Sequence, residues 1–287
     1  MAGAPGGCEH PGMLSLPPGK GALRYVVEGR PLSAASSAPS SSVSAAPPVV
    51  LVHDGLTDHH VWDEVAPVLA ADRTVVRYDL RGFGQSPPPD GPFEEVADLA
   101  ALLDHLGLAR VNLAGLSWGG RIAVEFALTH PERVSALAAF SPPWPGFDRS
   151  PELRAYDAAE GTALAAGDLD AAVEVNLDMW LRGPARPWSA VPPALISRVR
   201  APLRTALANQ PTVEAHSQPG TALPATALTS PTLIGAGALD TPDFVSMAHH
   251  YATAIPTATL VPFPTAGHLI PLEAPAAVVA ALRGVGF

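Results

Sequence analysis

The chain has 287 residues, of which 47 % are hydrophobic and only 15 % are charged, so it can bury the core of a large domain. Its 17 basic and 27 acidic residues give a net charge of −10, which argues against a nucleic-acid or membrane-surface partner, because both require clustered Lys and Arg. The single cysteine, Cys8, excludes an internal disulfide and a cysteine-rich metal site within this sequence. We find no signal sequence and no apolar run of ~20 residues, and we expect a cytoplasmic protein, with a secreted protein that lacks disulfides as the alternative.

The first part of the chain contains two segments of low complexity. Residues 1–21 are rich in Gly and Pro, which predicts a flexible N-terminal tail. Residues 22–28 (ALRYVVE) are typical of a strand. Residues 31–48 (PLSAASSAPSSSVSAAPP) predict a long flexible loop between two edge strands.

Strand and helix patterns alternate from residue 49 onward. Further strands are predicted at 49–53, 73–79, 110–115, 133–140, 231–237 and 257–263, and helices at 61–70, 93–106, 117–129, 242–253 and 272–283. Such alternation with short loops predicts an α/β domain with a mostly parallel sheet and helices on both faces. Residues 141–230 lack convincing strands and interrupt this pattern. We therefore expect a core of residues 22–140 and 231–287, with 141–230 as a helical cap over the carboxyl ends of the strands.

The stretch VNLAGLSWGG, residues 111–120, places one serine between glycines at a predicted strand-to-helix corner. A serine hydroxyl is a poor nucleophile, so it needs an adjacent base and exposure to substrate. A sharp turn would project Ser117 above the sheet edge, and Gly115 and Gly119 would remove side chains that otherwise collide there. The helix that follows directs free N–H groups at the site, which places the N–H of Trp118 to stabilise an oxyanion. A corner without chemistry is the alternative, and the strand–turn–helix context disfavours it.

A serine nucleophile also needs a base and a group that orients the base. Asp240 follows the strand 231–237, and His268 follows the strand 257–263 beside Gly267, which permits a tight backbone. The chain order Ser, Asp, His at successive strand ends predicts Ser117 as nucleophile, His268 as base and Asp240 as its orienting carboxylate. Asp243, one turn into the next helix, is the alternative acid.

Several stretches resemble the α/β-hydrolase superfamily in register, from about residue 22 to the C-terminus. They are GLSWGG (115–120), VLVHDGLTDHHVWDEVAPVLA (50–70), YDLRGFGQS (78–86), HPERVSALAAFSP (130–142), PTLIGAGALDTPDF (231–244) and FPTAGHLIPLEAP (263–275). The resemblance implies a sheet of the eight-stranded kind found in the family, with an inserted helical cap. It implies Ser117, His268 and Asp240 as the catalytic residues. It also implies that the N–H of Gly55 completes the oxyanion hole with Trp118. The sequence departs from the family at Asp54, where glycine is usual after the histidine, and we expect Asp54 to point away or to hydrogen-bond locally.

Other motifs carry weaker signals. GAGALD (235–240) lacks the third glycine of a dinucleotide site, and the adjacent pairs His59–His60 and His249–His250 lack a matching ligand pattern, so we expect no organic cofactor and no metal. Asp79 is expected to tie down the loop that follows it. Trp144, Trp180 and Trp188, in the cap and its entry segment, could line an apolar substrate pocket or simply pack the cap helices.

These features predict a serine hydrolase that cleaves a small to medium apolar carboxylic ester, lactone or thioester through an acyl-enzyme, with a small-molecule substrate as its partner. A serine at the elbow argues against epoxide hydrolase and haloalkane dehalogenase chemistry, and the oxyanion loop differs from that of proline iminopeptidases. A cofactor-free perhydrolase of the haloperoxidase type, a fold-sharing lyase or oxygenase, and a ligand-binding receptor of the same fold remain alternatives. Tight ligand binding without turnover would favour the receptor. The substrate's chain length and the oligomeric state do not follow from the sequence.

Overall fold

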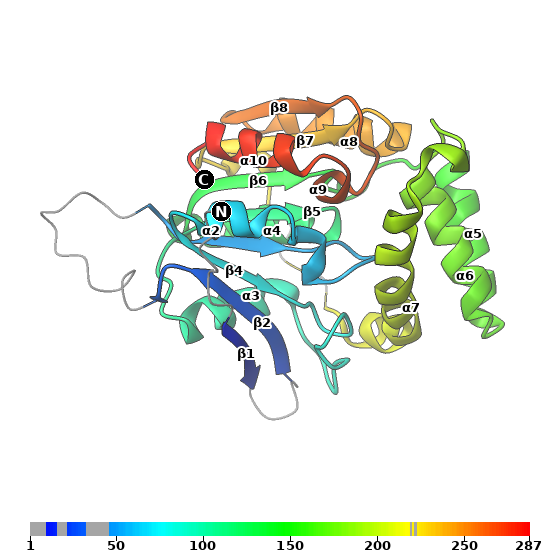
Figure 1. Cartoon of the computed structure of the whole chain (residues 1–287), viewed down its shortest axis with the longest axis horizontal. Coiled ribbons are helices and arrows are strands. Elements are labelled where there is room, and N and C mark those ends of the chain that lie inside the picture. Colours follow the sequence, from blue (N-terminus) through cyan, green and yellow to red (C-terminus); the bar gives the residue numbers. More distant parts are fainter. Residues whose placement is uncertain (1–9, 16–21, 33–45, 219, 221–222) are drawn as a thin grey trace, which may run out of the picture.

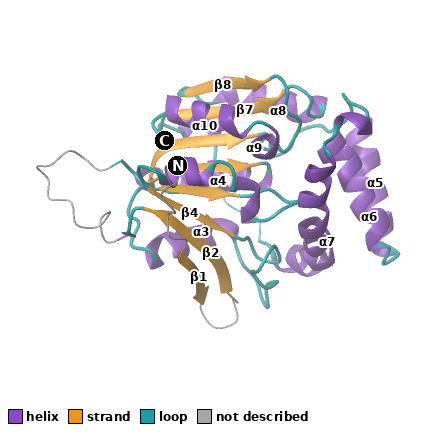
Figure 2. Cartoon of the chain, in the orientation of Figure 1, coloured by secondary structure: helices purple, strands orange, loops and turns teal. Residues whose placement is uncertain are grey.

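The computed structural model describes residues 10–15, 22–32, 46–218, 220 and 223–287. They contain an eight-stranded sheet in the order β1-β2-β4-β3-β5-β6-β7-β8 (Figures 1 and 2). β1 and β4 pair antiparallel with β2, and all other neighbours are parallel, which confirms the predicted fold class. The strands are β1 (His10–Ser15), β2 (Ala22–Gly29), β3 (Val49–Val52), β4 (Thr74–Tyr78), β5 (Val111–Leu116), β6 (Val134–Phe140), β7 (Thr232–Gly237) and β8 (Ala258–Phe263).

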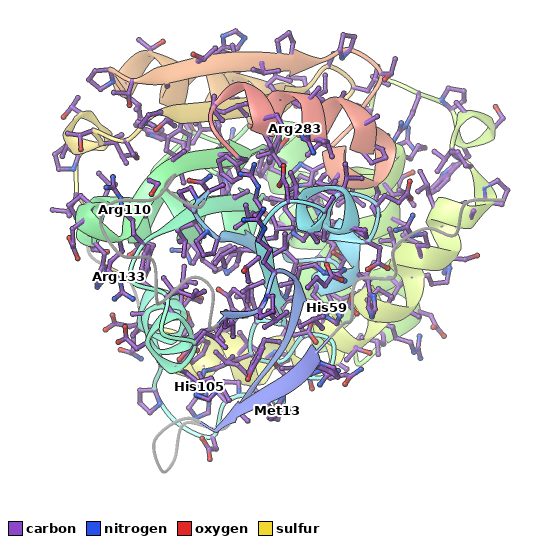
Figure 3. All side chains as sticks on the ribbon, turned by 60° about the vertical axis from the view of Figure 1, so that its left-hand side comes forward. Met13, His59, His105, Arg110, Arg133 and Arg283 are labelled. Carbon is purple, nitrogen blue, oxygen red and sulfur yellow. The ribbon has the colours of Figure 1, made fainter. Side chains whose placement is uncertain are left out.

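Strand β1 corrects one expectation, because its residues belong to the segment 1–21 that was predicted to be a flexible tail. In the register of β1 and β2, Gly12 lies opposite Tyr25, and a Cβ on Gly12 would come within 2.2 Å of the Tyr25 ring. The Tyr25 hydroxyl lies 3.1 Å from Nε2 of His105, which is labelled, as is Met13, in the lower part of the view in Figure 3. The rest of the predicted tail, and residues 33–45 of the predicted loop, lie outside the described residues. The expectation that the strands on either side of this loop are edge strands is wrong, because β2 lies between β1 and β4, and β3 lies between β4 and β5.

Helices cover both faces of the sheet, as the sequence predicts. On one face lie η1 (His59–Trp62), α2 (Ala66–Ala70), α9 (Ile270–Glu273) and α10 (Pro275–Gly284), and on the other α3 (Glu95–His105), α4 (Trp118–Thr129) and α8 (Pro242–Ala254). The buried strand β3 shows how one strand serves both layers. Val49 and Leu51 pack into the first layer, and Val50 and Val52 into the second, because successive side chains point to opposite faces.

The chain between β6 and β7 is helical and lies beyond the carboxyl ends of the parallel strands (Figure 1). It contains α5 (Pro151–Ala165), α6 (Leu169–Asn176), the π-helix η3 (Leu177–Arg182) and α7 (Pro193–His216). Short helical turns η2 (Pro131–Arg133), η4 (Trp188–Ala190) and η5 (Ala225–Ala227) complete the elements. The cap is tied to the core where the Asn209 amide donates to the Gly82 carbonyl at 2.8 Å. Within the described residues, no helix has both the length and the apolar character needed to cross a membrane.

Candidate active site

Ser117 stands at the corner between β5 and α4. Its φ of +50° lies in the left-handed region, which side-chain-bearing residues adopt only under strain. A Cβ on Gly115 would come within 2.1 Å of the Gly119 carbonyl oxygen, and one on Gly119 within 2.3 Å of the His53 carbonyl oxygen. Both contacts are with backbone atoms, so only glycine allows the strand, the helix and the neighbouring loop to approach this closely.

The structure brings Ser117, His268 and Asp240 into one hydrogen-bonded row. Ser117 Oγ lies 2.9 Å from His268 Nε2, and His268 Nδ1 lies 2.9 Å and 3.1 Å from the two carboxylate oxygens of Asp240. His268 and Asp240 are buried, at 3 % and 6 % exposure. The row can therefore pass a proton from the serine hydroxyl to a histidine whose other nitrogen is held by a carboxylate.

Two further donors fix the carboxylate of Asp240. The Ser141 hydroxyl donates to Oδ2 at 2.8 Å, and the backbone N–H of Thr241 donates to Oδ1 at 2.7 Å. The alternative acid, Asp243, instead accepts from the backbone N–H of Ser150 at 2.8 Å, where the cap begins. The geometry thus assigns the histidine's partner to Asp240 and gives Asp243 a contact with the cap.

The pKa of His268 reflects two opposing influences. Burial lowers it by disfavouring the charged ring, but the charge of Asp240 and its hydrogen bond outweigh burial, so the pKa lies above the ordinary value of 6.5. The carboxylates of Asp54 and Glu273 raise it further. The ring is consequently a stronger base than a free imidazole.

The loop after β3 brings Gly55 beside the elbow, where a Cβ on Gly55 would lie 3.8 Å from Cβ of Trp118. Within the part of the chain that the structure describes, the backbone N–H groups of Gly55 and Trp118 have no acceptor. Asp54 hydrogen-bonds locally, as expected: its carboxylate accepts from the N–H of Leu56 at 2.6 Å and from the N–H and hydroxyl of Thr57 at 3.0 and 2.6 Å. These bonds fix the turn that presents Gly55.

His53 anchors the same loop to the core. Its Nε2 accepts the backbone N–H of Leu80 at 2.9 Å, so Nδ1 carries the proton and donates to the Asp54 carbonyl at 2.6 Å. Both ring nitrogens are thereby occupied, and the histidine has a structural place under the loop.

A pocket of about 640 Å³ opens next to the row. Its lining includes Trp118 at the elbow and the rings of Trp180 and Phe244, which lie 4.6 and 4.7 Å from the His268 ring. Its lining is largely apolar, with Arg121 and Glu125 on one side. The other apolar lining residues include Val124, Leu128, Trp144, Phe147, Leu153, Met247 and Tyr251. The predicted pocket residues Trp144 and Trp180 therefore both line this pocket.

Comparisons with known proteins place this geometry in a family. A family model of the alpha/beta hydrolase fold matches residues 47–275. The chain belongs to this family. The solved structure of a hydrolase from Pseudomonas aeruginosa PA01 is 27 % identical, with a TM-score of 0.72 over 96 % of this chain and 97 % of that one. A thermophilic esterase from Thermogutta terrifontis is 26 % identical, with a TM-score of 0.71 over 97 % of this chain and all of that one (100 %).

Similarity to curated proteins is higher but covers less of the chain. A 2-hydroxy-6-oxo-2,4-heptadienoate hydrolase from Pseudomonas putida is 42 % identical over 102 residues, which are 33 % of this chain and 37 % of that protein. The matched segment spans only about a third of the length of such relatives, so this similarity concerns a part of the domain.

For two residues of this α/β-hydrolase domain the structure differs from the sequence analysis: one was predicted to line the pocket and does not, and the other lines it but was not predicted. Trp188 lies in a separate surface hollow with Tyr156 and Met179, and it does not line the pocket beside the row. Phe244, which the sequence analysis did not single out, packs against His268 instead. Its position four residues after Asp240 was the available signal, because the first turn of a helix after a strand end faces the same edge of the sheet.

The predicted structural role of Asp79 agrees with its contacts. Its carboxylate accepts from the N–H groups of His59 and Gln85 at 2.9 and 2.8 Å and pairs with the His59 ring at 2.6 Å. A Cβ on Gly84 would come within 2.4 Å of this carboxylate, so the loop wraps closely around it.

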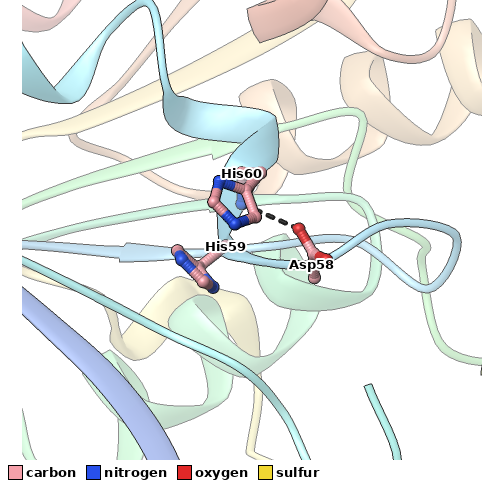
Figure 4. A group of neighbouring side chains, drawn as sticks. All are labelled: Asp58, His59 and His60. Atoms are coloured by element: carbon pink, nitrogen blue, oxygen red, sulfur yellow. Dashed lines mark hydrogen bonds between the residues drawn. The ribbon is translucent and has the colours of Figure 1, made fainter. Parts of the chain in front are cut away.

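Asp58, His59 and His60 form the one group of potential metal ligands found among the described residues (Figure 4). The two imidazole rings lie 4.1 Å apart with only 34° between their planes. One potential ligand atom of each of the three residues lies within 4.8 Å of the others. Each side chain also has a partner: Asp79 for His59, Asp63 for His60, and the His60 N–H for Asp58. These contacts give each of the three side chains a structural place in the loop after β3.

Proposed function

We propose that this protein is a serine hydrolase that cleaves small to medium apolar carboxylic esters through an acyl-enzyme. The observation that carries the proposal is the hydrogen bond of 2.9 Å between Ser117 Oγ, on its strained elbow, and His268 Nε2, with Asp240 behind the ring. The similarity over nearly the whole chain to a hydrolase and an esterase supports it.

In the first half-reaction, Ser117 Oγ attacks the carbonyl carbon of the ester, and its proton moves to Nε2 of His268. The carbonyl oxygen becomes an oxyanion, which accepts hydrogen bonds from the N–H groups of Gly55 and Trp118. The oxyanion then collapses, the bond to the alcohol oxygen breaks, and His268 returns the proton to that oxygen. The acyl group remains on Ser117.

In the second half-reaction, His268 takes a proton from water, and the hydroxide so formed attacks the acyl carbonyl. A second tetrahedral intermediate collapses, the bond to Ser117 Oγ breaks, and His268 returns the proton to the serine. The carboxylic acid leaves the site. Asp240 stays ionised throughout and stabilises the imidazolium that forms in each half.

The pocket supports an apolar substrate. Its lining includes the rings of Trp180 and Phe244, which offer a large apolar surface next to His268. A lactone or thioester presents the same electrophilic carbonyl to Ser117, so both belong to the proposed substrate class. The chemistry in each case is acyl transfer to serine and then to water.

The test is hydrolysis of p-nitrophenyl esters of increasing chain length by the wild type and by Ser117→Ala. Ser197→Ala, on the exposed face of α7, is the matched control. We expect the wild type and the control to turn over the esters and Ser117→Ala to lose the activity, by about 10³-fold or more. Equal rates in all three proteins, or no turnover of any ester, thioester or lactone by the wild type, would refute the proposal.

A further inference from the structure

One segment of the cap, residues 177–187, reaches the loops that carry both His268 and Asp240. It starts with the π-helix η3, a rare element that often occurs at functional sites. Trp180 of η3 packs on the His268 ring at 4.6 Å. Gly183, with a φ of +67°, passes so close to the loop before Asp240 that a Cβ would lie 2.9 Å from the Leu239 carbonyl oxygen.

The strongest link between this segment and the His268 loop is an ion pair between Arg186 and Glu273. Glu273 is at the end of α9, and its side chain is only 4 % exposed. One carboxylate oxygen accepts the backbone N–H of Gly267, next to His268, at 3.2 Å. The other carboxylate oxygen pairs with Nη1 of Arg186. The carboxylate therefore connects the histidine's own backbone to the cap.

The guanidinium of Arg186 is held on all sides. Its Nε donates to the Arg182 carbonyl at 2.8 Å, its Nη2 donates to the Leu181 carbonyl, and its Nη1 binds Glu273. These acceptors lie around the end of η3 and at α9, so the planar fork of the arginine fixes them relative to one another. A lysine has one ammonium group and cannot make the same set of bonds.

We propose that Arg186 and Glu273 are positioning residues, which place His268 against Ser117 by fixing the Gly267–His268 backbone to the cap. This inference rests on the proposed function, because it assigns the pair an effect on the reaction at Ser117. In this proposal the cap both lines the pocket and holds His268 in position for the reaction. The ends of the linkage are 87 residues apart in the chain.

The pKa of His268 separates the effect of charge from the effect of geometry in the two variants. The carboxylates that raise the pKa of His268 are Asp240, Asp54 and Glu273. Replacing Glu273 by Gln removes one of these charges and leaves Arg186 without its counter-ion, and both changes lower the pKa of His268. Replacing Arg186 by Lys keeps both charges and changes only the geometry.

The experiment compares Glu273→Gln and Arg186→Lys with Arg198→Ala, which removes another cap-to-core ion pair, the exposed one to Glu64. Each protein is assayed for kcat and KM with a p-nitrophenyl ester. The pKa of His268 is measured without substrate by ¹⁵N-histidine NMR, with its resonance assigned from the spectrum of His268→Gln. We expect both substitutions to lower kcat by about 10- to 100-fold with little change in KM, since misplacement of a reacting group has effects of this size. The pKa of His268 should fall in Glu273→Gln and stay in place in Arg186→Lys.

The control, Arg198→Ala, should keep kcat within about twofold of the wild type, because exposed ion pairs contribute little. Values of kcat for both test variants that match this control would overturn the inference. A wild type that fails to hydrolyse esters, in a protein whose His268 ring ¹⁵N resonances move in Arg186→Lys and stay in place in Arg198→Ala, would refute the proposed substrate class and leave the positioning contact supported. If Glu273→Gln does not fold, Arg186→Lys decides through kcat, because it preserves both charges.

Discussion

The ring of Trp180, which belongs to the cap, lies 4.6 Å from the ring of His268, which belongs to the core. Trp180 also packs edge-on against Phe244 at 5.2 Å, so it forms the junction between the pocket and the Ser117–His268–Asp240 row. We predict that Trp180→Ala lowers kcat/KM for long-chain p-nitrophenyl esters by about 10- to 200-fold, the range that loss of apolar pocket contacts produces.

Trp188→Ala is the matched control, because Trp188 lies in the same cap but outside the pocket. Its kcat/KM should equal that of the wild type across the ester series. An equal loss in both variants would mean that the cap responds as a whole and that Trp180 has no particular place in substrate binding.

The glycines of the elbow give a prediction about stability. Gly119→Ala would force a methyl group to within 2.3 Å of the His53 carbonyl oxygen, so we expect a loss of about 1–3 kcal/mol of unfolding free energy and loss of activity. Gly161, inside α5, has nothing within 4 Å of its Cβ position, so Gly161→Ala should instead stabilise the protein by about 0.5–1 kcal/mol. Chemical denaturation of both variants measures the two free energies, and a shift of the same sign in both would contradict the steric explanation.

The raised pKa of His268 predicts the acid limb of the pH profile. The general base acts only when it is neutral, so kcat/KM should fall as the pH drops through a value above 6.5. In Asp240→Asn, burial lowers the pKa of His268 and the Asp240 carboxylate no longer raises it, so the acid limb should move to lower pH. The rate on the plateau should fall by about 10³–10⁴-fold, because the asparagine favours the wrong tautomer.

Asp243→Asn serves as the control for Asp240→Asn, since its carboxylate holds Ser150 and does not contact His268. Its acid limb should coincide with that of the wild type, measured with the same ester between about pH 5 and 9. A limb that stays in place in Asp240→Asn would show that the Asp240 carboxylate does not set the pKa of His268.

The carboxylate of Asp54 gives a prediction about the oxyanion loop. Asp54→Ala leaves the N–H groups of Leu56 and Thr57 without their acceptor, so the turn that presents Gly55 should loosen. We expect kcat to fall by about 10- to 100-fold with a smaller effect on KM, because an oxyanion donor acts in the transition state. Asp58→Ala, which removes a similar local bond to the His60 N–H, should leave kcat unchanged. Equal kcat values in the two variants would show that the Asp54 carboxylate is not needed to hold Gly55 in place for the reaction.

The Ser117–His268–Asp240 row can be predicted from the sequence because its geometry constrains short stretches of chain. The approach of β5, α4 and the β3 loop excludes side chains at Gly115 and Gly119, so the constraint on Ser117 is visible locally. Asp240 and His268 follow successive parallel strands, whose carboxyl ends meet at one edge of the sheet. The order of these residues along the chain therefore indicates that they lie together in the fold.

Other features depend on contacts between distant residues. Arg186 and Glu273 are joined only by the folded cap, and no local pattern marks either of them. The sequence does not distinguish Trp188 from Trp180, because neither the direction of a cap helix nor the presence of the π-helix that contains Trp180 follows from composition. Strand β1 is hidden in the sequence because Gly and Pro oppose strand formation, yet Pro11 is tolerated on an edge strand that pairs on one side only.

The left-handed backbone of Ser117 has a consequence for the balance between activity and stability. A side chain at a φ of +50° costs about 1–3 kcal/mol, which the packing of β5 and α4 around it must outweigh. Glycine at this position would adopt the same backbone without that cost. The Ser117→Gly protein is therefore expected to resist unfolding better than the wild type, so the fold by itself would favour glycine at this position.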